Sequence, residues 1–103
     1  MAIKGVLEEE LKNSLRLKKS YEQALSKLPK GSLVKKRIKG HEYYYLLLRE
    51  QGKIKFTYKG KKVSSDIVKR YKEAKRLRAK YRKLLSEIRN QIKFLKQSLK
   101  NGK

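Results

Sequence analysis

Tyrosines and cationic side chains are interleaved in one stretch of the chain, residues 32–62. Three consecutive tyrosines, Tyr43, Tyr44 and Tyr45, lie near its centre, and Tyr58 follows near its end. Lysine and arginine neutralise phosphate groups, and tyrosine rings offer flat faces on which unpaired bases can stack. The residue types therefore indicate a surface that binds a polyanion rather than a reactive centre.

The groups that carry catalysis are sparse in this sequence. His41 is the single histidine and lies at an expected turn, Asp66 is the only aspartate, and the chain has no cysteine. A metal site or an acid–base pair needs several such groups at related spacings. The Lys-Gly pairs are turn signals and do not form a glycine-rich phosphate loop. We therefore expect a non-enzymatic protein with no cofactor and no metal.

Length and charge narrow the class of partner. The chain has 103 residues, which predicts one domain over residues 1–103, and its net charge is +22. Such a charge favours a polyanionic partner, with nucleic acid first and an anionic membrane surface second. No run approaches about 18 apolar residues, and no signal peptide is recognisable, so we expect a cytoplasmic protein without a membrane segment.

The hydrophobic pattern predicts an α+β fold with three parts. Apolar residues at helical spacing predict a helix over residues 5–28 and a long helix over residues 65–100. Short alternating segments predict a three-stranded antiparallel β-meander over residues 32–59. Pro29 ends the first helix, and Ser64 or Ser65 caps the second. We expect an antiparallel, coiled-coil-like helical hairpin with the meander at its tip.

The long helix is expected to outrun its partner. If the shorter first helix pairs with the front half of the long one, an apolar stripe remains uncovered at the distal end. We expect this stripe to meet another protein or a second copy of the chain, the alternative being a frayed tail. The stripe comprises Leu85, Ile88, Ile92, Leu95 and Leu99.

Alternation along the strands predicts two different sheet faces. The face expected to pack on helix collects Val34, Ile38, Tyr44, Leu46, Leu48, Ile54, Phe56 and Tyr58. The face expected to bind nucleic acid collects Lys35, Arg37, Lys39, Tyr43, Tyr45, Arg49, Lys53 and Lys55, with Leu47 among them. The long helix adds the basic candidates Lys69, Arg70, Lys72, Arg76, Lys80 and Lys83. The alternative is that these cations are merely solvated and keep the edge strands from aggregating.

The segment LPKGSLVKKRIKGHEYYYLLLREQGKIKFTYKGK resembles small uncharacterised bacterial and archaeal proteins in which such a meander lies between two helices. It is also similar to the N-terminal β-hairpin region of some DDE-class transposases. The resemblance covers residues 28–61 and implies a nucleic-acid-facing module in a mobile-element or phage-like context. The transposase catalytic domain is absent, so no catalytic role carries over. The matching positions are Leu28, Pro29, Lys30, Gly31, Gly40, Tyr43, Tyr44, Tyr45, Leu46, Arg49, Gly52, Lys53, Lys55, Tyr58, Gly60 and Lys61.

Three functions are compatible with these features. The first is binding of DNA or RNA through the basic, aromatic sheet face and the basic helix. The second is an accessory subunit of a nucleoprotein effector complex, such as an RNA-guided nuclease or a transposition machinery, docked through the distal stripe. The third is an inhibitor that occupies an acidic surface of a nucleic-acid enzyme.

Overall fold

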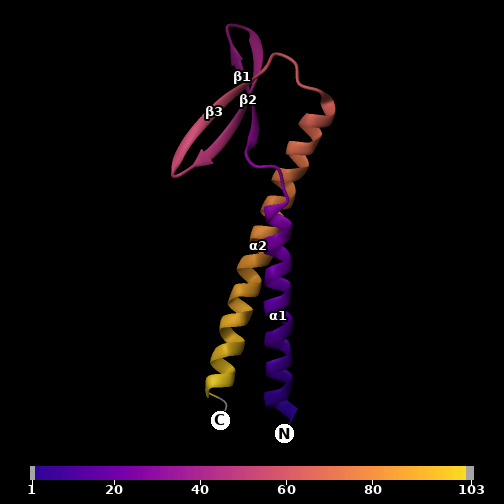
Figure 1. The fold of residues 1–103 in the computed structure, drawn as a ribbon, viewed down its shortest axis with the longest axis vertical. Coiled ribbons are helices and arrows are strands. Elements are labelled where there is room, and N and C mark those ends of the chain that lie inside the picture. The colour runs from indigo at the N-terminus through magenta and orange to yellow at the C-terminus, as the bar shows by residue number, and fades with distance from the viewer. Residues whose placement is uncertain (1, 102–103) are drawn as a thin grey trace. The chain divides into compact units, whose positions relative to one another are not determined.

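The computed structural model describes residues 2–101 and confirms the α+β class. Its elements are α1 (Ala2–Ser26), β1 (Ser32–Ile38), β2 (His41–Glu50), β3 (Lys53–Gly60) and α2 (Ser65–Asn101) (Figure 1). The residues group into two compact units. The helical unit holds the chain up to Lys27 and from Arg78 onward, and the sheet unit holds Leu28–Leu77. No helix in this described part is long and apolar enough to cross a bilayer.

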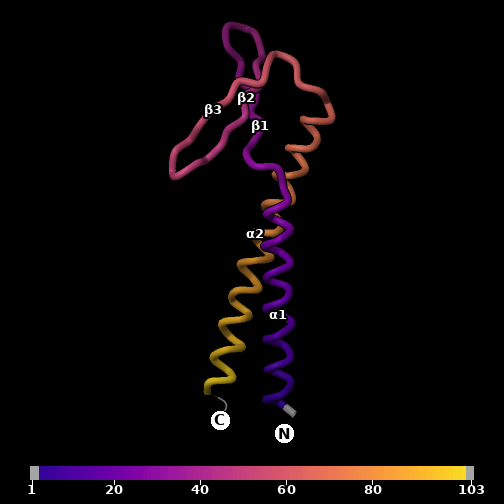
Figure 2. The backbone as a smooth tube through the Cα atoms, viewed as in Figure 1, coloured from indigo at the N-terminus to yellow at the C-terminus, as the bar shows by residue number. Residues whose placement is uncertain are grey.

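In the helical unit, α1 and the second part of α2 run side by side in opposite directions (Figures 1 and 2). Apolar residues at steps of three and four place one stripe of each helix against the other. The stripes form a core from Leu85, Ile88 and Ile92 of α2, with Leu11, Tyr21 and Leu25 of α1 packed against them. The two helices are therefore held together by apolar side chains of the chain itself.

A small polar residue interrupts the α1 stripe. Ser14 is 1% exposed, and its Oγ accepts a hydrogen bond from Nε2 of Gln91 at 3.3 Å. This bond satisfies a hydroxyl whose burial would otherwise be unfavourable. One end of the seam is marked by an aromatic contact, in which the Tyr21 and Tyr81 rings lie 6.0 Å apart.

The prediction that the distal stripe of α2 stays uncovered is wrong. Its first four members are 4–7% exposed, and Leu99 is half-buried. The reason lies at the front of α2, where Ile67 and Tyr71 belong to the sheet unit and line a cavity with sheet leucines. Since the front half is used in this way, α1 pairs with the back half. The stripe is a core and not a docking surface.

The sheet unit contains the meander in the order β1-β2-β3, with all pairs antiparallel. Two-residue turns join the strands, and the central residues of both turns have positive φ. The values are 50° and 81° at Lys39 and Gly40, and 51° and 77° at Gln51 and Gly52. Such pairs match the right-handed twist of the flanking strands, and glycine at the second position adopts them without steric cost.

Gly31 allows the chain to enter β1 past the end of β2. Its φ is 92°, and a Cβ atom there would lie 2.8 Å from the carbonyl oxygen of Leu47 and 2.8 Å from Cδ2 of Leu48. Only a residue without a side chain fits this approach. The Pro-Lys-Gly break after α1 is thus a packing requirement as well as a helix stop.

Ser64, one of the two serines predicted as the cap, caps α2. Its Oγ accepts a hydrogen bond from the amide of Ile67 at 3.3 Å, and its carbonyl accepts one from the amide of Val68 at 3.1 Å. Asp66 lies in the first turn, where a negative charge suits the helix dipole. The cap fixes where the helix starts after β3.

Candidate nucleic-acid interface

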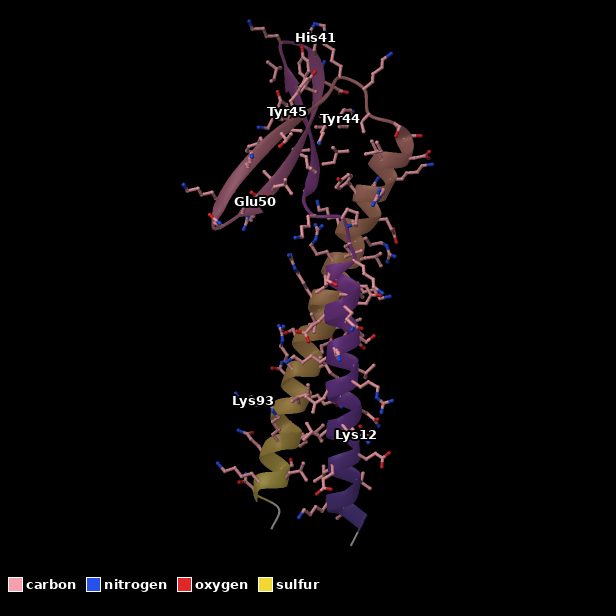
Figure 3. All side chains as sticks on the ribbon, in the orientation of Figure 1. Lys12, His41, Tyr44, Tyr45, Glu50 and Lys93 are labelled. Carbon is pink, nitrogen blue, oxygen red and sulfur yellow. The ribbon has the colours of Figure 1, made fainter. Side chains whose placement is uncertain are left out.

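Strand register decides which side chains share a face of the sheet. Tyr45 lies opposite Val34 on β1 and Tyr58 on β3, whereas Leu46 lies opposite Leu33 and Thr57. Residues directly opposite each other in antiparallel strands point to the same side. Adjacent residues of one strand point to opposite sides, as Tyr44 and Tyr45 of β2 do (Figure 3).

The predicted grouping of the two faces is therefore wrong. It places even-numbered residues of all three strands together. A two-residue turn instead pairs an even residue with an odd one, as in Ile38 opposite His41 and Glu50 opposite Lys53. Consequently the odd-numbered residues of β2 share a face with the even-numbered residues of β1 and β3. The two predicted site tyrosines of β2 lie on one side, and four predicted cations lie on the other, namely Lys35, Arg37, Lys53 and Lys55.

We call the side that carries Tyr45 the aromatic face. Register places on it Val34, Lys36, Ile38, His41, Tyr43, Tyr45, Leu47, Arg49, Ile54, Phe56 and Tyr58. Its β3 side chains are well exposed, with Phe56 at 47% and Tyr58 at 54%. An exposed cluster of large apolar and aromatic side chains marks a binding surface more often than it marks a plain solvated face.

Four rings form a row on the aromatic face. The Tyr58 ring centroid lies 5.5 Å from that of Tyr45 and 6.2 Å from that of Tyr43. His41 continues the row, 6.5 Å from Tyr43. The ring planes are tilted against one another by 54–59°, so the rings contact each other without stacking face to face.

Two lysines lie over rings of this face. The Nζ of Lys36 is 3.9 Å from the Phe56 centroid and 5.4 Å from that of Tyr45. The Nζ of Lys61, just after β3, is 5.8 Å from the Tyr43 centroid. Among the described residues, no ammonium group lies over Tyr58, and its side chain is more exposed than those of Tyr43 and Tyr45.

We call the opposite side the leucine face. Leu46 is 9% exposed there, and a cavity of about 330 Å³ separates this face from the start of α2. The cavity is lined by Leu33, Leu46, Lys59, Lys62, Val63, Ser64, Ile67, Arg70 and Tyr71. Lys59 enters the lining because β3 has one extra residue where Tyr45 pairs with Tyr58 but Tyr44 pairs with Gly60. Around Leu46 this face is therefore less accessible than the aromatic face.

An ion pair occupies the edge of the leucine face. Lys35 Nζ lies 2.8 Å from Oε2 of Glu42, the residue before the tyrosine run. The hydrogen bond and the charge of Glu42 raise the pKa of Lys35 above its ordinary value. The hydrogen bond from Lys35 lowers the pKa of Glu42. Lys35 is thus engaged within the protein, although both side chains are about half exposed.

The remaining predicted residues are distributed over both units. Lys39 is exposed in the first turn, and Arg49 is exposed on the aromatic face. Four candidates of α2 lie in the sheet unit and two in the helical unit, and all are exposed: Lys69, Arg70, Lys72 and Arg76, then Lys80 and Lys83. Arg76 forms an ion pair with Glu73, and the hydrogen bond from Arg76 lowers the pKa of that carboxyl group.

Sequence reasoning omitted five residues of the candidate interface, namely Lys36, Phe56, Tyr58, Lys61 and His41. The signal that identifies the first three is present in the sequence. Glycine at the second position of each turn indicates two-residue loops. Such loops place even-numbered residues of one strand opposite odd-numbered residues of the next. Lys61 follows β3, and its reach to Tyr43 is visible only in three dimensions.

Within residues 2–101, no three potential ligands from histidine, cysteine, aspartate and glutamate gather into a metal site.

No curated protein and no solved structure matches the chain. Residues 7–69 match DUF6788, a domain of unknown function. The match includes most of α1, the whole meander and the start of α2, and therefore all of the aromatic face. Because it covers more than half of the sequence, the chain belongs to the DUF6788 family.

Proposed function

We propose that the protein is a non-enzymatic nucleic-acid-binding protein that acts in the cytoplasm and holds the phosphate backbone with exposed lysines and arginines. The observation that carries this proposal is the imbalance of charge, because the chain has 31 lysine and arginine residues and only nine aspartate and glutamate residues. Even if every carboxylate were paired, most cations would lack a partner within the chain. Self-repulsion of this size destabilises a compact protein unless a polyanion relieves it.

The sheet unit is the part best suited to hold the polyanion. It combines the row of rings with a high density of exposed cations. Besides Lys35, which pairs with Glu42, those exposed between β1 and the second turn of α2 are Lys36, Arg37, Lys39, Arg49, Lys53, Lys55, Lys59, Lys61, Lys62, Lys69, Arg70 and Lys72. Point charges on flexible stems neutralise phosphates without reading a base sequence. We therefore expect strong affinity at low salt and weak sequence preference.

An anionic membrane surface fits the same charges less well. A helix that lies on a membrane needs an uncovered apolar face to insert between the headgroups. The apolar stripe of α2 is used in the core of the helical unit, where Leu85, Ile88 and Ile92 are buried. Burial of the stripe equally removes the surface through which we expected an accessory subunit to dock.

The proposal is tested by the salt dependence of binding. Fluorescence anisotropy with a labelled oligonucleotide would follow affinity between 50 and 200 mM salt. If about 6–10 phosphates are contacted, the association constant falls by about 10³–10⁵ over this range. Binding that is absent at 50 mM salt, or that does not respond to salt, contradicts the proposal.

Charge variants refine the same measurement. Substitution of Lys36, Arg49 and Lys61 by glutamine should reduce the salt slope by about one for each phosphate that is no longer neutralised. A matched triple substitution of Lys93, Lys96 and Lys100, which are exposed in the helical unit and are not interface candidates, controls for the reduction in net charge. Polyglutamate serves as a competitor without phosphates, and if it displaced the oligonucleotide at equal charge concentration, an acidic protein surface would be the better assignment.

A further inference from the structure

We propose that the aromatic face is a stacking platform for unpaired bases, so that the target is single-stranded nucleic acid. This inference rests on the proposed function and specifies its substrate class. Cations alone do not distinguish a duplex from a single strand, because both expose phosphates. Rings distinguish them, since the base faces of a duplex are covered by neighbouring base pairs and only the edges are reachable.

The spacing of the rings supports an unpaired strand. The centroids of neighbouring rings in the row lie 5.5, 6.2 and 6.5 Å apart. Successive bases of one strand in a duplex are separated by about 3.4 Å. Bases that each rest on a different ring of the row are therefore too far apart to stay stacked on one another. Only an unstacked, extended strand satisfies this geometry.

Tyr58 is the ring on which we expect the first base. It is central, because it contacts both Tyr43 and Tyr45, and its side of β3 is open to solvent. No ammonium group within the described residues covers it. A base can approach this ring without displacing a protein group.

The two lysines over the other rings give those positions a second function. Base stacking on an aromatic ring is stronger than an exposed cation–π contact by roughly a factor of two in free energy. An arriving base would thus displace the ammonium groups of Lys36 from Phe56 and of Lys61 from Tyr43. Each ammonium group remains tethered beside its ring, at a position suited to the phosphate of the same nucleotide. Stacking and phosphate neutralisation are thereby coupled.

Charge favours a nucleic-acid strand over a second copy of the chain on this face. The exposed apolar side chains Ile38 and Ile54 could contribute to a dimer contact. In a two-fold dimer the same patch occurs on both subunits, so the cations of one copy would meet those of the other. Lys36, Arg49 and Lys61 would oppose such an arrangement, whereas a polyanion would relieve the repulsion.

The experiment compares four probes of equal length, about 12 nucleotides, on the intact protein at low salt. The probes are oligo(dT), oligo(U), an abasic strand with the same phosphates, and a blunt DNA duplex. Stacking predicts that oligo(dT) or oligo(U) binds at least tenfold more tightly than the abasic strand and than the duplex. The ratio of oligo(dT) to oligo(U) affinity then tells which sugar is preferred. Intrinsic tyrosine fluorescence, which no tryptophan obscures, should be quenched by oligo(dT) and oligo(U) and not by the abasic strand or the duplex.

Variants assign the effect to the row of rings. Tyr58→Ala should weaken oligo(dT) binding by about five- to hundredfold and leave abasic-strand binding unchanged, whereas Tyr58→Phe should keep the affinity. Phe94→Ala is the matched control, because Phe94 is an exposed ring at 65% in the helical unit. Circular dichroism establishes that each variant is folded. Equal binding of all four probes, with no effect of Tyr58→Ala, would overturn this inference while leaving the proposed function intact. Absence of binding to every probe would overturn both.

Discussion

Tyr45 and Tyr58 face each other across β2 and β3, with ring centroids 5.5 Å apart and ring planes tilted by 57°. Their direct pairing follows from the two-residue turn at Gln51 and Gly52, which fixes the register of the hairpin. If the loop instead took in one residue of either strand, the register would shift by one, and Tyr45 and Tyr58 would lie on opposite sides of the sheet. The row of rings therefore depends on turn geometry as much as on the tyrosines.

The contact of Lys36 with Phe56 should be measurable as a coupling free energy. In a double-mutant cycle with Lys36→Gln and Phe56→Ala, we expect about 0.5–1 kcal/mol of coupling in the free energy of unfolding, as for exposed cation–π pairs. Urea denaturation of the four proteins provides the measurement. Lys55 offers the matched control, because it neighbours Phe56 in sequence but points to the leucine face. A Lys55–Phe56 cycle should give no coupling, and equal values for both cycles would argue against a specific contact.

Local pattern was sufficient to predict the elements of this protein. The period of the apolar residues predicted both helices and the meander, with boundaries within three residues of those observed at every element. The residue types limited the cap of α2 to Ser64 or Ser65, and the structure shows that it is Ser64. Such features depend on neighbours in sequence, so the sequence alone carries them.

The faces of the sheet and the half of α2 that pairs with α1 were not predicted, because they depend on relations between distant residues. Grouping even-numbered residues of all three strands on one face set Tyr43 beside Arg37 on the wrong side of the sheet. Similarly, the apolar stripe of α2 is continuous, and nothing local shows that Ile67 and Tyr71 serve the sheet unit. Which half of α2 meets α1 is settled only when the sheet is in place.

Gly31 should tolerate no side chain. In Gly31→Ala the new Cβ atom would meet the Leu47 carbonyl oxygen and Leu48 Cδ2 at 2.8 Å, in a residue with φ of 92°. Backbone strain and overpacking together predict a decrease of about 2–4 kcal/mol in the free energy of unfolding. Gly40→Ala is the control, since its φ is 81° but no atom lies within 4 Å of the added Cβ. It should cost about 1–2 kcal/mol, and equal decreases at the two sites would show that the close approach at Gly31 is not tight.

The core of the helical unit makes the distal half of α2 essential for folding. Ile92→Ala removes a side chain that is 7% exposed and should lower the free energy of unfolding by about 2–4 kcal/mol. Phe94→Ala, two residues away on the exposed side, should change it by less than about 0.5 kcal/mol. Thermal unfolding followed by circular dichroism at 222 nm would report both. If Ile92→Ala were as mild as Phe94→Ala, α1 would not cover the stripe.

The ion pair between Lys35 and Glu42 predicts a pH-dependent contact at the edge of the leucine face. Because the pKa of Glu42 is lowered in the folded protein, its stabilising contribution is present above its unfolded pKa and is lost as pH falls through the folded value. The pKa of Lys35 is raised, so its contribution is lost as pH rises through the folded value. The pair is therefore intact at neutral pH and breaks at both acidic and alkaline pH.

Carboxyl NMR titration of Glu42 measures this directly. Lys35→Met should raise the pKa of Glu42, because the hydrogen bond from Lys35 is the largest cause of its lowering. Arg37→Met provides the control, since Arg37 acts on Glu42 only through its charge and as the smallest contribution, so it should raise the pKa less. An unchanged Glu42 titration in Lys35→Met would show that the two side chains are not paired in solution. In that case Lys35 would join the cations available to a phosphate backbone.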